Sequence, residues 1–336
     1  MAGGIKALRK IQYARNADSD SGSEIDATSI WRGTGTLQDD RNLYIIEEDV
    51  GILSGTDRTN TSFLGGSLSL DAIEATYEQF PNLLEMSIAA ATATSDSGAG
   101  SGFDRTYTYP TTAKNTLRDY TFEGGDNQQA ELLDFVHCRD WTLSGEEKGA
   151  WMMSGNLFGR QVANTTFTAG VSLPTVYNMN FGKTKLYIDD DSDDFGTTQI
   201  SNALLSATIS YNANLIDKAP ANGNLYYEFV ETPAPEMVAT VTFEHDANAV
   251  LEKTDWRAET PRLIRFINEG TALTSAGTYT YRTLIVDMAG KWLSFAKIGE
   301  RNGNDILEGT FRMRYNATKA TGGKIIVVNE VDILAT

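Results

Sequence analysis

The chain has 336 residues and a hydrophobic content of 41%, which is enough for one large globular domain or two ordinary ones. Its 28 Lys and Arg against 45 Asp and Glu give a net charge of -17, and so acidic a surface argues against nucleic-acid binding by charge neutralisation. The single cysteine, Cys138, excludes an internal disulfide, and no apolar run is long enough to span a bilayer. We therefore expect a globular protein that matures in a cytoplasm and has no membrane partner.

Residues 1–30 divide into a basic amphipathic piece and a polar piece. Ile5, Leu8 and Ile11 are spaced three apart, which is unusual for a frayed terminus. We therefore expect an N-terminal arm with a docking surface, followed by a tether. The basic residues of this arm are Lys6, Arg9, Lys10 and Arg15.

The first half of the remaining chain predicts mainly strands with one helix. The helix is expected over residues 71–86, with a capping box of Thr76 and Gln79 and with Pro81 near its start. Residues 89–102 are of low complexity and are expected to form a mobile loop. A strand that ends in a glycine turn is expected at residues 120–125.

The second half predicts the same kinds of element. A helix is expected to begin with Asp246 as its cap. Alternating or β-branched and aromatic runs, bounded by Gly, Asn, Asp or Pro, predict short antiparallel strands. These runs are ATISYNA, NLYYEFVE, ATVTFEHD, TYTYRTLIVDM, WLSFAKIG, EGTFRMRYNA and KIIVVNEVDIL.

The two halves show a partial internal repeat. Leu-Tyr-Ile stands before acidic residues and a glycine at residues 43–51 and again at 186–196, and each half then has a strand, a helix and a glycine turn in the same order. We interpret this as a duplicated β unit, with domains at residues 31–175 and 176–336 after the arm and tether of residues 1–30. Loops of unequal length explain the imperfect spacing, because loop closure costs little per added residue.

The stretch LYIDDDSDDFG, residues 186–196, raises the question of a metal. A calcium loop needs oxygen ligands at positions 1, 3 and 5, a glycine at 6 and a glutamate at 12. Starting at Asp189 places Asp194 at position 6, and starting at Asp191 places Phe195 at position 5. We therefore predict a solvated acidic turn at a strand end and no metal site.

Residues for catalysis are few. His137 and Cys138 are neighbours on a predicted strand, so their side chains point to opposite faces and cannot share a substrate or a zinc ion. His245 lies beside the predicted helix cap, and no nucleotide-binding or nucleophile motif occurs in a supporting context. We expect no enzyme, no cofactor and no metal. The tryptophans, which are core residues in most β proteins but could form a sugar platform, are Trp31, Trp141, Trp151, Trp256 and Trp292.

Several segments, taken in order, resemble the tail tube protein, or major tail protein, of long-tailed non-contractile (siphovirus-type) bacteriophages. The resemblance covers most of residues 5–196, is weaker afterwards, and rests on the order of the segments more than on any one of them. They are IKALRKIQYAR, TSIWRGTGTLQDDRNLYIIEEDVGILSGTDR, SLSLDAIEATYEQFPNLLEMSI, YTFEGGDNQQAE, LSGEEKGAWMMSGNLFGRQVANTTFT and LYIDDD.

The resemblance implies a mainly β fold of two tandem tail-tube-type β-sandwich or barrel domains, each with a short helix. It implies that three chains close a ring with pseudo-sixfold symmetry and that rings stack into a tube, through whose acidic lumen the genome passes without adhering. The implied partners are other copies of the chain and the tape measure, tail terminator and tail tip proteins. The implied location is the virion tail, after assembly in the host cytoplasm.

Two sets of residues follow as candidates under this hypothesis. Lys6, Arg9, Lys10 and Arg15 are candidates for contact between rings, because a basic arm suits the acidic surface of an adjacent ring. Asp134 and Asp140 share a face of the predicted strand ELLDFVHCRDWTL, and they are candidates for the lumen wall. The alternative is a carbohydrate-binding β-sandwich module or adhesin, and an enzyme is third.

Overall fold

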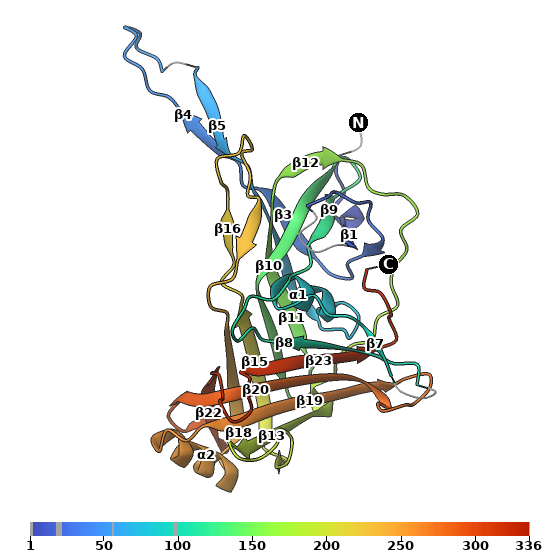
Figure 1. The fold of residues 1–336 in the computed structure, drawn as a ribbon, viewed down its shortest axis with the longest axis vertical. Coiled ribbons are helices and arrows are strands. Elements are labelled where there is room, and N and C mark those ends of the chain that lie inside the picture. Colours follow the sequence, from blue (N-terminus) through green and yellow to red (C-terminus); the bar gives the residue numbers. More distant parts are fainter. Residues whose placement is uncertain (1–2, 18–21, 56, 97–99, 336) are drawn as a thin grey trace.

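The computed structural model describes residues 3–17, 22–55, 57–96 and 100–335. The chain is mainly β and antiparallel, as the alternating pattern predicted (Figure 1). In the described part of the chain, nineteen strands join one hydrogen-bonded network, and two hairpins stand outside it. These hairpins are β4 (Asn42–Ile45) with β5 (Thr59–Phe63), and β16 (Ile216–Lys218) with β17 (Phe229–Glu231).

Eight strands form the main run of neighbours across the molecule. Four of them, β15, β18, β22 and β20, confirm strands that were predicted from alternation. In spatial order the run is β3 (Gly35–Asp39), β6 (Gly66–Glu74), β11 (Met152–Gly159), β10 (Ala130–Glu146), β15 (Leu204–Asn212), β18 (Glu236–Glu244), β22 (Asn304–Met313) and β20 (Tyr281–Phe295).

The two longest strands, β10 and β20, each pass from this run into a second group of strands. The first part of β10 pairs with β9 and β12, and the first part of β20 pairs with β19 and β23. The remaining strands are β1 (Lys10–Arg15), β2 (Ser29–Ile30), β7 (Thr94–Ser95), β8 (Phe103–Thr108), β9 (Tyr120–Gly125), β12 (Val162–Thr165), β13 (Thr184–Asp190), β14 (Gln199–Ile200), β19 (Arg262–Ala272), β21 (Gly299–Arg301) and β23 (Gly323–Asn329).

The helices are α1 (Phe80–Ser87) and α2 (Ala247–Arg257), with short 3-10 turns at Lys6–Leu8 and Phe181–Lys183. Helix α2 begins as predicted, since the Asp246 side chain accepts the Ala249 N–H at 2.9 Å. Helix α1 starts later than predicted, because residues 71–74 continue strand β6. The predicted capping contact is present in the turn before α1, where the Thr76 hydroxyl accepts the Gln79 N–H at 3.2 Å.

The two halves of the chain share one hydrogen-bonded network and one main core. Strand β10 pairs with β15, and β23 pairs with β8, so the strands of residues 31–175 join those of residues 176–336 at two places. A single hydrophobic cluster includes Tyr13, Trp141, Phe243 and Val327. The Leu-Tyr-Ile echo is not structurally equivalent, because β4 is exposed in a hairpin whereas Leu186 and Ile188 of β13 are buried.

The N-terminal segment is part of the fold beyond residue 9. Strand β1 pairs with β9 along its whole length and with β2 at its centre, and residues 11–14 are buried. Ile11 thus contributes to the core, and the predicted arm is restricted to residues 3–9 of the described chain. Part of the predicted tether, residues 18–21, lies outside the described residues, as do residues 97–99 of the predicted mobile loop.

Candidate functional site

The residues most capable of catalysis are buried in the core. His137 and Cys138 are both fully buried in β10, and the His137 ring lies against the rings of Phe135 and Phe158. Burial lowers the pKa of His137 to about 4 and raises the pKa of the Cys138 thiol well above its usual value. A neutral imidazole and a protonated thiol without access to solvent are suited to packing, not to acid–base or nucleophilic chemistry.

The acidic stretch that ends β13 is a loop closed by one buried carboxylate. Asp189 is 1% exposed and accepts the backbone N–H groups of Gly196 at 2.7 Å, Thr197 at 3.2 Å and Thr198 at 2.5 Å. The prediction of a turn at a strand end is confirmed, but Asp189 is not solvated. Among the described residues, no group of three or more His, Cys, Asp or Glu side chains is arranged to hold a metal ion.

Replacing Asp189 with alanine is expected to lower the free energy of unfolding by about 3 kcal/mol, because three backbone donors lose a charged acceptor at a buried position. Urea unfolding measures the loss. Asp194→Ala is the control, since its side chain is 96% exposed and pairs with Lys319 at 3.0 Å, a contact worth well under about 1 kcal/mol. Equal stability of the two variants would contradict this role for Asp189. A chelator is expected to leave both midpoints unchanged.

The tryptophans do not form an exposed platform. Trp31, Trp141, Trp151 and Trp292 are at most 4% exposed, and all four belong to the main core. Trp256 is half-buried and packs against Phe295, with its indole N–H donating to the Leu293 carbonyl at 3.1 Å. The interpretation as core residues is confirmed for the first four, and these four are not exposed to a sugar.

The basic residues proposed for contact between rings divide into two pairs. Lys6 and Arg9 are exposed at the rim of a hollow of about 790 Å³ beside β1 and β3. Lys10 lies over the Phe167 ring at 4.2 Å, and Arg15 forms an ion pair with the buried Glu85 at 2.5 Å. Of the four, only Lys6 and Arg9 present a charge that is not already engaged within the fold.

The two carboxylates proposed for a lumen wall lie in different environments. Asp134 is buried and accepts the Gln161 N–H at 3.2 Å, and burial raises its pKa. Asp140 is partly exposed and accepts from the Asn156 side chain at 2.8 Å. Between them β10 is irregular, with Phe135 at a φ of 50°. Asp140 is therefore the only one of the two that presents its carboxylate to solvent.

The most exposed apolar surface lies on the β4–β5 hairpin, which projects from the body of the molecule (Figure 1). Its strands and the loop between them carry six aliphatic or aromatic side chains that are more than half exposed, and Leu53 is fully exposed. Exposed apolar patches of this kind mark sites of association. The six residues are Leu43, Tyr44, Ile45, Val50, Ile52 and Leu53.

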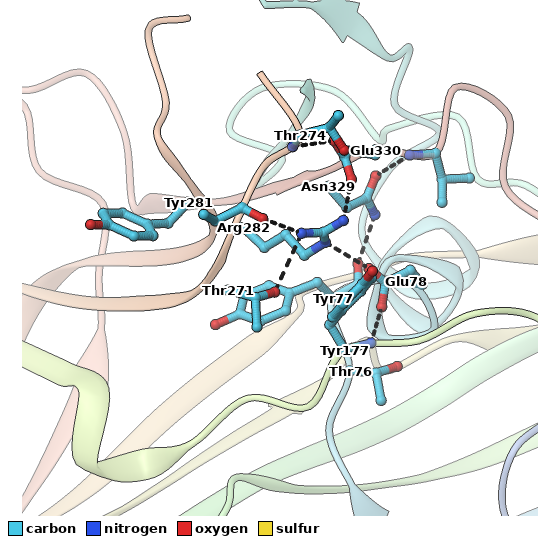
Figure 2. Close-up of polar contacts among 12 residues, drawn as sticks. Thr76, Tyr77, Glu78, Tyr177, Thr271, Thr274, Tyr281, Arg282, Asn329 and Glu330 are labelled. Carbon is cyan, nitrogen blue, oxygen red and sulfur yellow. Dashed lines mark hydrogen bonds and ion pairs between the residues drawn. The ribbon is translucent and has the colours of Figure 1, made fainter. Parts of the chain in front are cut away.

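A buried polar cluster joins segments that are distant in the sequence (Figure 2). Arg282 of β20 lies at its centre, forms an ion pair with Glu330 and is 3.6 Å from a Glu78 carboxylate oxygen. Its guanidinium also donates to the Ala272 carbonyl at 2.6 Å and stacks over the Tyr177 ring at 3.7 Å. The cluster thus fastens the turn before α1, the segment before β13 and the C-terminal segment to β20.

Glu78 has an unusual protonation equilibrium in this cluster. Burial raises its pKa to about 7, although the Tyr177 N–H, donated at 2.7 Å, and the charge of Arg282 both lower it. In the folded chain Glu78 therefore binds a proton more tightly than an ordinary glutamate does. The polar groups that contact it include the Tyr177 N–H and Arg282, so the arrangement suits stabilisation better than catalysis.

A Glu78→Gln variant is expected to become more stable relative to the native chain as pH rises from 4 to 8. The raised folded pKa gives the native chain stability that is complete below the unfolded value, near 4.5, and is lost as pH rises through about 7. Glutamine cannot titrate, so the difference grows by roughly 3 kcal/mol across the window. Urea unfolding at several pH values measures it. The exposed Glu300→Gln is the control, and a difference independent of pH would contradict the prediction.

Comparisons with known proteins give no relative. A scan of protein-family models finds none that matches the chain, and a search of curated proteins finds no significant match. Within the described ranges, no helix has both the length and the apolar composition needed to cross a membrane.

Proposed function

We propose that this chain is a structural subunit that assembles with copies of itself into stacked rings. The rings would form the tail tube of a long-tailed non-contractile bacteriophage and conduct the genome. The observation that carries the proposal is the projecting β4–β5 hairpin, because its exposed aliphatic side chains are of little use to an isolated chain and suit burial against another subunit. The same residues belong to the segment that carries the resemblance to tail tube proteins.

The order of elements supports a duplicated unit within the subunit. The first half runs β6, α1, β9, β10 and β11, and the second runs β18, α2, β19, β20 and β22. The match omits β7 and β8, which lie between α1 and β9, and β21, which lies between β20 and β22. In each half a strand and a helix precede a long strand that bridges two groups of strands. Two similar units per chain allow three chains to supply six repeats around a ring. Because β10 pairs with β15 and β23 pairs with β8, the two units would share a continuous hydrogen-bonded network.

The charge of the chain is compatible with a conduit for DNA. A net charge of -17 per subunit gives an assembled ring a large negative charge, which repels the phosphate backbone and keeps DNA from adhering. Asp140 remains a candidate for such a wall. The partners in this proposal are other copies of the chain and the proteins that begin, measure and end a tail.

Negative-stain electron microscopy of the purified chain over a range of concentrations tests the proposal. Rings or tubes that grow in number with concentration are expected, and sedimentation velocity should show the same transition. A monomer at all concentrations would overturn the proposal, and saturable glycan binding by that monomer would favour the carbohydrate-binding alternative.

A further inference from the structure

Helix α2 turns Val250 and Leu251 toward solvent, although Trp256 packs inward against Phe295. Its buried positions are Ala249 and Glu252. The Glu252 carboxylate accepts hydrogen bonds from the Arg262 guanidinium at 2.6 Å and from the Trp292 indole N–H at 2.9 Å. An amphipathic helix normally turns its apolar stripe toward the core. Here residues at helical spacing form an exposed stripe, which we call the outer stripe of α2: Ala247, Val250, Leu251, Thr254 and Ala258.

A basic edge borders the outer stripe. Lys253 and Arg257 are four apart and lie on the same side of the helix as Val250. The acidic Asp255 lies toward the opposite side and is 3.9 Å from Arg262. Glu259, just beyond the helix, is the nearby exposed carboxylate. The surface therefore combines half-exposed aliphatic side chains, Val250 at 50% and Leu251 at 54%, with two cations.

The hairpin loop carries the complementary combination. Glu47 and Asp49 are exposed, while Glu48 is engaged by Arg58. Residues 42–63 contain four carboxylates and one arginine, which gives 1 − 4 = −3. Val50, Ile52 and Leu53 follow the acidic residues directly. We call Glu47, Asp49, Val50, Ile52 and Leu53 the hairpin tip.

The two surfaces lie at opposite ends of the long axis of the molecule (Figure 1). Neither can reach the other within one chain, but a second copy displaced along that axis can bring them together. Contacts between two different surfaces of identical subunits propagate head to tail. Apolar residues on both sides and opposite charges at the edges favour this contact over one between two hairpins or two helices.

We propose that the outer stripe of α2 is the receptor for the hairpin tip of a second copy of this chain. Val50, Ile52 and Leu53 pack on Val250 and Leu251, and Glu47 and Asp49 face Lys253 and Arg257. This inference rests on the proposed function, since it names the acceptor for the projecting hairpin. It assigns an assembly role to a helix whose outer face has no partner among the described residues of its own chain.

Cross-linking between singly substituted chains tests the pairing. The native Cys138 is fully buried, so thiols introduced by Ile52→Cys and by Leu251→Cys are the reactive ones. Equal amounts of the two proteins are mixed at a concentration where assemblies form and are treated with a short bismaleimide. A covalent dimer is expected in the mixture and in neither protein alone. Leu173→Cys replaces Leu251→Cys in the control mixture, because Leu173 is similarly exposed, at 59%.

The outcomes separate this inference from the proposed function. Assemblies without the Ile52–Leu251 dimer, or with as much dimer in the Leu173 mixture, would overturn the pairing and leave the proposed function standing. No assembly under any condition would overturn both. A dimer from Ile52→Cys alone would indicate a contact between hairpins and would also overturn the pairing.

Charge reversal supplies a second readout. Glu47→Lys/Asp49→Lys and Lys253→Glu/Arg257→Glu are each expected to raise the concentration needed for assembly about tenfold to a hundredfold, as for lost charge pairs at interfaces. Combining all four substitutions restores opposite charges and is expected to recover most of the loss. Additive losses in the combined variant would contradict a direct contact.

Discussion

Replacing Val50, Ile52 and Leu53 together with serine is expected to leave the fold intact and to abolish long assemblies. All three side chains are more than half exposed, so the folded chain loses little when they change. Burying each against another subunit is worth about 1.5 kcal/mol, so the three together amount to about 4.5 kcal/mol, or roughly two-thousandfold in the association constant. We therefore expect the substitutions to weaken association between subunits and to leave the stability of the folded chain nearly unchanged.

Sedimentation velocity and electron microscopy measure this effect, and thermal unfolding at low concentration checks the fold. Leu173→Ser/Ile333→Ser is the matched control, since both residues are exposed aliphatics elsewhere on the surface. The control is expected to assemble as the native chain does. If the triple serine variant assembles at the native concentration, the hairpin is not an assembly contact.

Local signals in the sequence identified the elements that depend on local chemistry. Alternation predicted strands β15, β18, β20, β22 and β23, because each lies in a sheet that buries at least part of one face. Asp246 was recognisable as a cap because its acceptor bonds a donor three residues away. These features need no knowledge of the rest of the chain.

The features that were missed depend on contacts between distant residues. The Leu-Tyr-Ile run of β4 has the composition of a buried strand, and only its position in a projecting hairpin exposes it. Asp189 belongs to an acidic run that predicts a solvated turn, but the returning loop brings three N–H groups to its carboxylate. The irregularity at Phe135, which interrupts β10 between Asp134 and Asp140, has no signal in the sequence.

The cluster around Arg282 was also missed, because charged residues are expected at the surface and its members come from four separate segments (Figure 2). The Arg282 side chain is 5% exposed and that of Glu78 is 8% exposed. A buried charge is tolerated only when it is paired and hydrogen-bonded. We therefore expect the largest effect on stability from replacing Arg282, which contacts the carboxylates of both Glu78 and Glu330.

Replacing Arg282 with methionine is expected to lower the free energy of unfolding at pH 7 by about 3–5 kcal/mol, the usual cost of removing one partner from a buried ionic group. Methionine retains the apolar stem, so the loss reports the missing guanidinium. Glu78 and Glu330 lose their cation, and the carbonyl of Ala272 and the hydroxyl of Thr271 lose a donor. Arg282→Lys keeps the charge but lacks the planar guanidinium, so its free energy of unfolding should lie between those of the native chain and of Arg282→Met.

The pH dependence of this loss distinguishes lost charge pairing from lost packing. Partial burial acts to raise the pKa of Glu330, but hydrogen bonds from Ser101 and Thr274 and the charge of Arg282 lower it to about 2. A lowered folded pKa gives stability that is present above the unfolded value, near 4.5, and is lost as pH falls toward 2. The deficit of Arg282→Met should therefore be largest above pH 5 and shrink in acid, as the stranded carboxylates take up protons. A packing defect would be independent of pH.

A double-mutant cycle with Glu78→Gln completes the test. Removing the carboxylate that Arg282→Met leaves stranded should recover part of the deficit, so the double variant is expected to be more stable than the sum of the single effects predicts, by about 1–3 kcal/mol. Urea unfolding of the four proteins at pH 7 measures the coupling. Strict additivity would show that Arg282 does not act through Glu78. The ion pair with Glu330 and the stacking on Tyr177 would then account for its effect, because those contacts remain in the Glu78→Gln background.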